Sequence, residues 1–253
     1  MPRKAREQSP TGIYHVMMRG INRQSIFEEE KDRLKFIEKL AEFRDKNSYR
    51  LFAYCLMDNH IHILLQELSE PIGVSIKRIS SSYVLWFNKK YERCGHLFQE
   101  RFKSEIVSTD SYFLTALRYI HQNPIKAKIV EDISHYKWSS YGEYFGQGHI
   151  VDKDYVLGMF SGTSSEALRL FEIFSREMIT EVCLDVEETK QGISDVRLRE
   201  ILKEKFGIDS IKLANEERKR QEEILKELKQ LKGTSIRQIS RTTGVSQTRV
   251  WKA

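Results

Sequence analysis

Residues 49–66 (YRLFAYCLMDNHIHILLQ) decide the fold, because two runs of β-forming residues meet here at a tight turn. Aromatic and aliphatic side chains dominate both runs, as is typical of strands. Asp58 and Asn59 lie between the runs, and both residue types favour turns because their side chains hydrogen-bond the local backbone. The stretch therefore predicts an antiparallel hairpin with strands at residues 49–57 and 60–66.

Strand and helix patterns flank this hairpin on both sides. Residues 12–19 are rich in β-formers and predict a strand, whereas residues 28–46 repeat apolar side chains at helical spacing between charges. Downstream, residues 72–91 predict a second amphipathic helix, and residues 103–108 predict a short fourth strand.

A third helix follows the fourth strand. We predict that Asp110 is its N-cap and that the helix ends before Pro124, because the residue preceding a proline disfavours helical dihedrals. The resulting order is βαββαβ plus one more helix. This order predicts an α+β, ferredoxin-like domain, in which two helices cover one face of a four-stranded antiparallel sheet. The third helix and a ligand would share the other face.

The pattern changes near residue 157, where strand signals end and helical spacing with dense mixed charge takes over. We therefore predict two domains, one over residues 1–150 and an all-helical one over residues 157–253. Near residue 253, apolar positions around Gly244 have the spacing of two short helices joined by a tight turn. This spacing predicts a helix-turn-helix whose second helix presents Gln247, Thr248 and Arg249 to duplex DNA. A plain helical hairpin is the alternative.

Composition favours a cytoplasmic protein with a polyanionic partner. The formal net charge is +6 and the sequence pI is about 9.1, and surplus Lys and Arg displace the counterions condensed on nucleic-acid phosphates. Three scattered cysteines without a CxxC pair exclude a zinc knuckle and a disulfide framework, and they indicate a reducing compartment. Apolar runs are strand-sized and none follows the charged amino terminus, so we expect neither a membrane span nor a signal peptide.

Two short motifs carry residues suited to metal and phosphoryl chemistry. His60 and His62 alternate with isoleucines on a predicted strand, so both imidazoles point to one face and can share a metal ion. Tyr119 and Asn123 are four residues apart and share one face of the third helix, where an amide oxygen would complete a metal site beside a phenol. Each motif also has a purely structural interpretation: hydrogen-bonded surface histidines, and a core tyrosine with a helix-terminal Asn.

Five stretches, taken together, resemble a known family. They are residues 12–16 with Arg19, Gly20 and Asn22, then residues 54–64, 95–104, 119–130 and 138–141. In this order, over about residues 10–145, the sequence resembles the single-tyrosine HUH transposases and, among them, the REP-associated tyrosine transposases.

The resemblance implies a site and a reaction. His60 and His62 match the histidines of the HUH motif, Tyr119 matches the nucleophile, and Asn123 stands where related enzymes place a third, amide-type metal ligand. The implied cofactor is Mg²⁺ or Mn²⁺, and the implied partner is single-stranded DNA with hairpin ends. The tyrosine would attack phosphorus to leave a 5′-phosphotyrosine and a free 3′-OH, a step that a second 3′-OH reverses without ATP. Some relatives share a site across a homodimer, whereas the REP-associated group resembles a monomer acting in cis.

Basic and polar side chains close to these motifs are expected to hold the DNA strand. They follow the first strand or precede the fourth, and they are Arg19, Asn22, Arg23, Gln99, Arg101 and Lys103.

Three other interpretations remain beside this one. A histidine-triad nucleotide hydrolase needs a third alternating histidine, but Leu64 occupies that position. An RNA-binding module of the same βαββαβ order binds through aromatic residues on its central strands, where this chain has His60 and His62. The third is a catalytically silent transposase that its host retains as a DNA-binding regulator.

Overall fold

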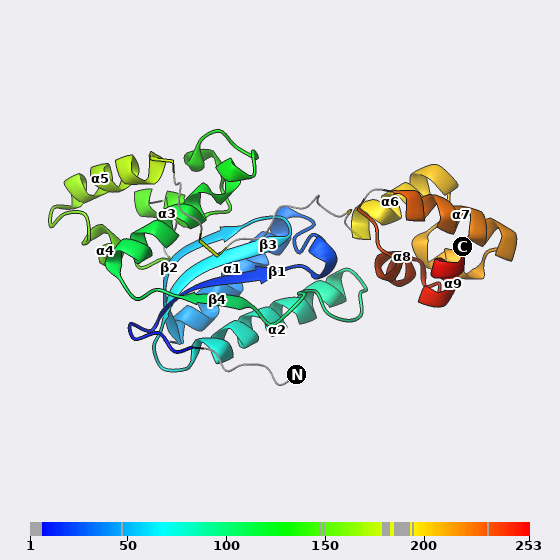
Figure 1. Cartoon of the computed structure of the whole chain (residues 1–253), viewed down its shortest axis with the longest axis horizontal. Helices are drawn as coiled ribbons and strands as arrows, with labels where there is room; N and C mark the ends of the chain where they lie inside the picture. Colours follow the sequence, from blue (N-terminus) through cyan, green and yellow to red (C-terminus); the bar gives the residue numbers. More distant parts are fainter. Residues whose placement is uncertain are drawn as a thin grey trace.

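The predicted ferredoxin-like sheet is present. The computed structural model describes residues 7–46, 48–146, 148, 150–178, 183–184, 193, 195–231 and 233–253. Four antiparallel strands lie in the order β2-β3-β1-β4. Their bounds are β1 Ile13–Arg19, β2 Tyr49–Leu56, β3 His60–Glu67 and β4 Lys103–Ile106. The hairpin of β2 and β3 and the α+β class are therefore confirmed (Figure 1).

Helices α1 (Glu30–Asp45) and α2 (Ile72–Lys90) pack together along one side of the sheet (Figure 1). Side chains alternate between faces along a strand, so Ile61 and Ile63 of β3 point to the side opposite His60 and His62. Tyr49 of β2 shares that side, and its hydroxyl donates a hydrogen bond of 2.6 Å to the carbonyl of Leu40 in α1. The two helices and the isoleucine face thus form one side of the apolar core, and other elements cover the histidine face.

Helix α3 (Asp110–Lys126) packs against β2 and β3 from the histidine side. Both predicted ends of this helix were wrong. Thr109 is the N-cap, because it has extended dihedrals and its side chain accepts a hydrogen bond from the backbone N–H of Tyr112. The helix also continues through Pro124, which lies in the last turn, where a missing N–H removes only one helical hydrogen bond.

The chain after α3 returns to the first core. The short helices η2 (Ile133–His135), η3 (Ser140–Phe145) and α4 (Lys153–Leu157) lead to α5 (Ser164–Arg176). Phe171 of α5 stacks on Tyr144 with ring centroids 4.3 Å apart, and the Tyr144 hydroxyl donates to the carbonyl of Phe52 in β2. Helices α4 and α5 therefore belong to the hydrophobic cluster of the sheet.

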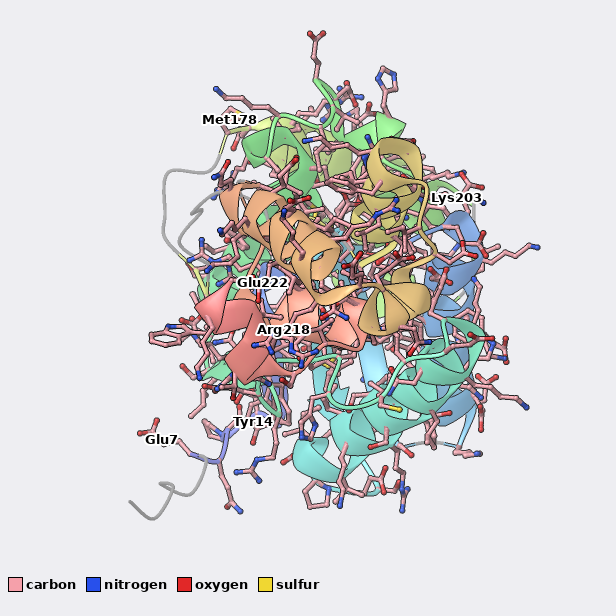
Figure 2. All side chains as sticks on the ribbon, turned by 90° about the vertical axis from the view of Figure 1, so that its right-hand side faces the viewer. Glu7, Tyr14, Met178, Lys203, Arg218 and Glu222 are labelled. Carbon is pink, nitrogen blue, oxygen red and sulfur yellow. The ribbon has the colours of Figure 1, made fainter. Side chains whose placement is uncertain are left out.

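A second hydrophobic cluster lies to the right of the sheet in Figure 1. It is built from α6 (Asp195–Phe206), η4 (Ser210–Asn215), α7 (Arg218–Gln230), α8 (Ile236–Thr243) and α9 (Gln247–Lys252). We call these elements the helical unit. Figure 2 views the molecule from this side, and charged side chains of α7, with Arg218 and Glu222 labelled, face the viewer.

The predicted domains at residues 1–150 and 157–253 match the two clusters only in part, because α4 and α5 pack with the first. The division into domains stays a prediction. Within the helical unit, α8 and α9 are joined at Gly244, whose positive φ of 73° suits the expected tight turn. Across the described ranges, no helix combines the length and the apolar composition that crossing a bilayer requires.

Candidate active site

The histidine pair lies on β3, next to β1. Arg19 of β1 is the register partner of His60, and Met17 is the partner of His62, so all four side chains share one face. The rings of His60 and His62 are 5.1 Å apart between centroids. His62 is fully buried, whereas His60 is partly exposed. One imidazole is therefore held inside the protein while the other lies at the surface of the site.

Helix α3 brings Tyr119 to this pair. The Tyr119 ring meets the His62 ring edge-to-face, with centroids 5.6 Å apart, and the tyrosine is only 1% exposed. Asn123 lies one turn further along the helix, and its amide nitrogen donates to the carbonyl of Tyr119 at 3.3 Å. Since the nitrogen is used within the helix, the amide oxygen is the atom that Asn123 can offer to a metal ion.

Hydrogen bonds orient the exposed imidazole. Nδ1 of His60 lies 2.6 Å from Oδ1 of Asn59, and the Asn59 amide nitrogen donates to the carbonyl of Arg23. That second bond fixes the amide, so the oxygen faces the imidazole and Nδ1 of His60 must carry the proton. In the neutral ring the lone pair is then on Nε2, which is the arrangement a metal ligand needs.

The buried imidazole has a similar arrangement. Nδ1 of His62 lies 2.9 Å from Nε2 of His15, while Nε2 of His62 has no hydrogen-bond partner among the described residues. Burial, followed by the charges of His60, His15 and Lys126, lowers the pKa of His62 well below 6.5. The ring is therefore neutral at physiological pH. Its Nε2 is buried without a partner among the described residues and fits a metal ligand in the tautomer that carries the proton on Nδ1.

The described part of the chain has no group of three or more His, Cys, Asp or Glu side chains placed to hold a metal. A metal at this site would therefore take two imidazole nitrogens and complete its coordination with oxygen from Asn123, water or substrate. Imidazole nitrogen suits transition metals and Mg²⁺ prefers oxygen, so such a mixed N and O set fits Mn²⁺ more readily than Mg²⁺.

Three residues beside the site were missed by the sequence reasoning. His15 contacts His62, and Glu105 of β4 lies 3.9 Å from the other ring nitrogen of His15. The ammonium of Lys126 lies 4.2 Å from the ring centroid of Tyr119. Lys126 is seven residues, or two turns, after the tyrosine, a spacing that would have indicated it had the helix not been expected to end before Pro124.

Some of the predicted DNA contacts surround a cavity beside the histidines. Arg19, Gln99 and Lys103 line it together with Met17, Glu100 and Phe102, and its volume is about 130 Å³. Burial, and then repulsion from Arg23, lowers the pKa of Arg19. Its Nε is buried without a hydrogen-bond partner among the described residues, so an anion in the cavity would gain a direct counter-charge.

The other predicted contacts lie elsewhere. Asn22 and Arg23 belong to the short helix η1 (Ile21–Arg23), where both have positive φ, and Arg101 is exposed next to the cavity-lining residues. Gln247 and Thr248 line a hollow of about 430 Å³ on the helical unit with Ile236, Arg237 and Trp251. Arg249 is exposed, but its guanidinium also donates to Gln221 of α7. The predicted contacts thus fall on two separate surfaces.

Comparison with known proteins gives matches that agree with the fold and with the arrangement of the histidines and the tyrosine. Residues 9–123 match the family model described as IS200-like transposase, so this part of the chain is similar to that family. The match ends at Asn123 and does not include the helical unit.

Individual relatives narrow the class. A Haemophilus influenzae protein, whose name places it among the REP-associated tyrosine transposases, is 28% identical over 105 residues. The aligned part is 37% of this chain and 59% of that relative, so the chain spans little more than half of it. A solved REP-associated tyrosine transposase bound to a REP hairpin superposes with a TM-score of 0.51, at 14% identity, over 65% of this chain and 93% of its own. At that identity the superposition shows the fold alone. The resemblance to REP-associated tyrosine transposases is confirmed.

Proposed function

We propose that this transposase cuts and rejoins single-stranded DNA through a covalent bond between Tyr119 and a 5′-phosphate. The observation that carries the proposal is the edge-to-face contact of Tyr119 with His62, in a pair of histidines whose Nδ1 atoms are both engaged. A buried phenol beside two oriented imidazoles is more than a core needs, because Leu or Phe would fill the same space without polar atoms to satisfy.

In this proposal the phenol oxygen of Tyr119 attacks phosphorus, and the bond from phosphorus to the 3′ oxygen breaks. The phenol loses its proton and the departing 3′ oxygen gains one, which leaves a 5′-phosphotyrosine and a free 3′-OH. Mg²⁺ or Mn²⁺ held by His60, His62 and Asn123 would supply neutralisation of the charge that develops on the phosphate. The phosphodiester energy is kept in the covalent link, so a second 3′-OH can reverse the step.

The chain's own residues supply the remaining electrostatics. Lys126, over the face of the Tyr119 ring, stabilises the phenolate relative to the phenol. Arg19 and Lys103 present positive charge to the cavity next to His60 and would hold the phosphates that flank the scissile bond. Asn22, Arg23, Gln99 and Arg101 would extend this contact along the strand.

We further propose that the substrate is single-stranded DNA with hairpin ends, because the solved relative with the same fold is bound to a hairpin. The helical unit offers a second contact, with duplex DNA, through Gln247, Thr248 and Arg249. Its support is the pair of short helices joined at Gly244, with the second helix exposed at its start.

The test is a cleavage assay on labelled single-stranded hairpins taken from the DNA around the gene. It compares Mn²⁺, Mg²⁺ and EDTA, and it compares wild type with Tyr119→Phe. Tyr155→Phe is the matched control, since Tyr155 is also packed among aromatic rings but lies against Phe52 and Phe113, away from the histidines. We expect a metal-dependent protein–DNA adduct in wild type and Tyr155→Phe and none in Tyr119→Phe. Hairpin binding without any adduct would refute the transfer reaction and favour a silent DNA-binding regulator.

A further inference from the structure

Three side chains from three neighbouring strands form a line that ends at the buried histidine. Glu105 of β4 is the register partner of His15 of β1, and His15 in turn contacts His62 of β3. Oε2 of Glu105 lies 3.9 Å from Nδ1 of His15, and Nε2 of His15 lies 2.9 Å from Nδ1 of His62. Both imidazoles are fully buried, so water does not compete for the contact between the two rings, whereas the Glu105 side chain is 37% exposed.

Only one proton can lie between two imidazole nitrogens at 2.9 Å, and its position decides which nitrogen of His62 is the ligand. If His15 donated from Nε2, His62 would accept at Nδ1 and carry its own proton on Nε2, which would block that atom as a ligand. If His62 donates from Nδ1, its Nε2 keeps the lone pair. The two arrangements differ in whether Nδ1 of His15 presents a lone pair or an N–H to Glu105.

The charge of the Glu105 carboxylate, 3.9 Å from Nδ1 of His15, would favour one of them. An ionised carboxylate only accepts, so it favours a proton on the facing Nδ1 of His15, and a neutral His15 then has its lone pair on Nε2. Glu105 is itself held in place, because Oε2 accepts hydrogen bonds from the Tyr112 hydroxyl at 2.5 Å and from the backbone N–H of Leu184 at 2.9 Å. Burial raises the pKa of Tyr112, so its hydroxyl stays protonated and continues to donate.

We propose that Glu105 and His15 are positioning residues that set the tautomer of His62 and thereby prepare its Nε2 to bind the metal. The inference rests on the proposed function, since it gives His62 a ligand role. His60 shows the same arrangement with a single partner, because the Asn59 side chain accepts from Nδ1 of His60 as His15 would from Nδ1 of His62. Removing an outer hydrogen-bond partner of this kind usually weakens metal binding about 10–100-fold.

The experiment compares His15→Gln with His15→Leu. The Gln oxygen can accept from Nδ1 of His62 where Nε2 of His15 does, whereas Leu fills the space and cannot accept. Mn²⁺ affinity is measured by electron paramagnetic resonance of the free ion. We expect His15→Gln to bind Mn²⁺ within about threefold of wild type and His15→Leu to bind roughly 10–100-fold more weakly. Equal losses in both variants would overturn the proposal in favour of a shape role for His15.

A second measurement does not depend on metal, on DNA or on the Leu variant folding. Long-range ¹⁵N–¹H spectra of the metal-free wild type report the tautomer of His62, with His62→Gln used for assignment. A proton on Nδ1 of His62 is the expected result, and a proton on Nε2 would overturn the proposed role of Glu105 and His15. If Nδ1 of His62 is protonated but the protein forms no DNA adduct, the positioning role is supported while the transfer reaction is refuted. Failure of one proposal can therefore be told apart from failure of the other. Absence of Mn²⁺ binding by wild type would overturn the ligand role of His62 and the proposal with it.

Discussion

Replacing Asp195 by Asn should detach the helical unit from the domain that contains the sheet. Asp195 begins α6, and its carboxylate accepts from Nε of Arg93, next to α2, at 3.2 Å and from two nitrogens of Arg241 in α8 at 2.8 and 2.9 Å. The side chains of Asp195 and Arg93 are almost completely buried. The substitution keeps the shape, removes the charge and turns an amide N–H₂ group toward an arginine that can only donate.

The expected loss of docking free energy depends on the hydrogen bonds that Arg93 and Arg241 keep after the substitution. Removing one partner of a buried ion pair costs about 3–5 kcal/mol because the other charge stays buried and uncompensated. Both arginines also donate to Oε1 of Gln24, at 3.3 and 2.7 Å, and the Arg241 side chain is 21% exposed. The lower end of the range therefore applies, and ~3 kcal/mol corresponds to roughly a 150-fold change in the docking equilibrium.

Hydrogen exchange measures this directly. Backbone amides around Gln24 and Arg93 should exchange roughly 100-fold faster in Asp195→Asn than in wild type at the same pH. Glu200→Gln is the matched control, because Glu200 is also on α6 but forms an exposed pair with Arg197 that contributes little. If both variants exchange alike, the buried network does not hold the unit in place and the reasoning is wrong.

The same carboxylate sets a pH dependence. Burial alone would raise the pKa of Asp195, but the hydrogen bond and charge of Arg241 and the charge of Arg93 lower it below its ordinary value of 3.8. A lowered carboxyl pKa contributes stability above the unfolded-state value, and that stability is lost as pH falls through the folded-state value. Docking should therefore be constant at neutral pH and weaken only below about pH 4, and Asp195→Asn should show no such step.

Three further predictions concern the site and its surroundings. Gly20→Ala places a Cβ 2.2 Å from the carbonyl oxygen of Gln24, so urea unfolding should show a loss of about 1–3 kcal/mol, and an unchanged midpoint would mean that the turn relaxes freely. Mn²⁺ at 100 times its Kd should stabilise wild type by about 2.7 kcal/mol in thermal unfolding, reversibly with EDTA, and equal stabilisation of His62→Gln would place the metal elsewhere. Lys126→Met removes the ammonium over the Tyr119 ring, so adduct formation should require higher pH, and an unshifted pH–rate profile would exclude a role in stabilising the phenolate.

Local patterns were enough to predict the sheet and its helices. The alternation of His60, Ile61 and His62 placed both histidines on one face, and the structure has them there. The ends of α3 were harder, because a proline stops a helix only when its missing N–H and its ring conflict with an interior turn. Pro124 lies in the last turn, so the helix continues and brings Lys126 over Tyr119.

Long-range relations were out of reach of such patterns. Nothing in residues 12–19 reveals the register of β1 against β3, so the contact of His15 with His62 could not be predicted although both residues were visible. Phe171 shows the same limit in packing, since the pattern after residue 157 predicts helices but not which core an apolar helix face joins. The resemblance to a family, rather than spacing, suggested that Tyr119 would meet the histidines.

The burial of the proposed nucleophile bears on how DNA would reach it. Tyr119 is only 1% exposed, so a phosphodiester cannot meet its oxygen until something moves. A shift of α3 is costly, because Phe113, Leu117 and Ile120 of this helix are buried in the core. Lys126 is a long, flexible side chain at the end of the helix, and its ammonium over the ring is worth only about 0.5–2 kcal/mol. A phosphate held near Arg19 and His60 would attract that ammonium with a full opposite charge, so binding of the proposed substrate would favour moving the ammonium off the ring. The tyrosine is shielded from water in this structure, so in the proposed reaction exposure of the nucleophile would depend on the presence of DNA.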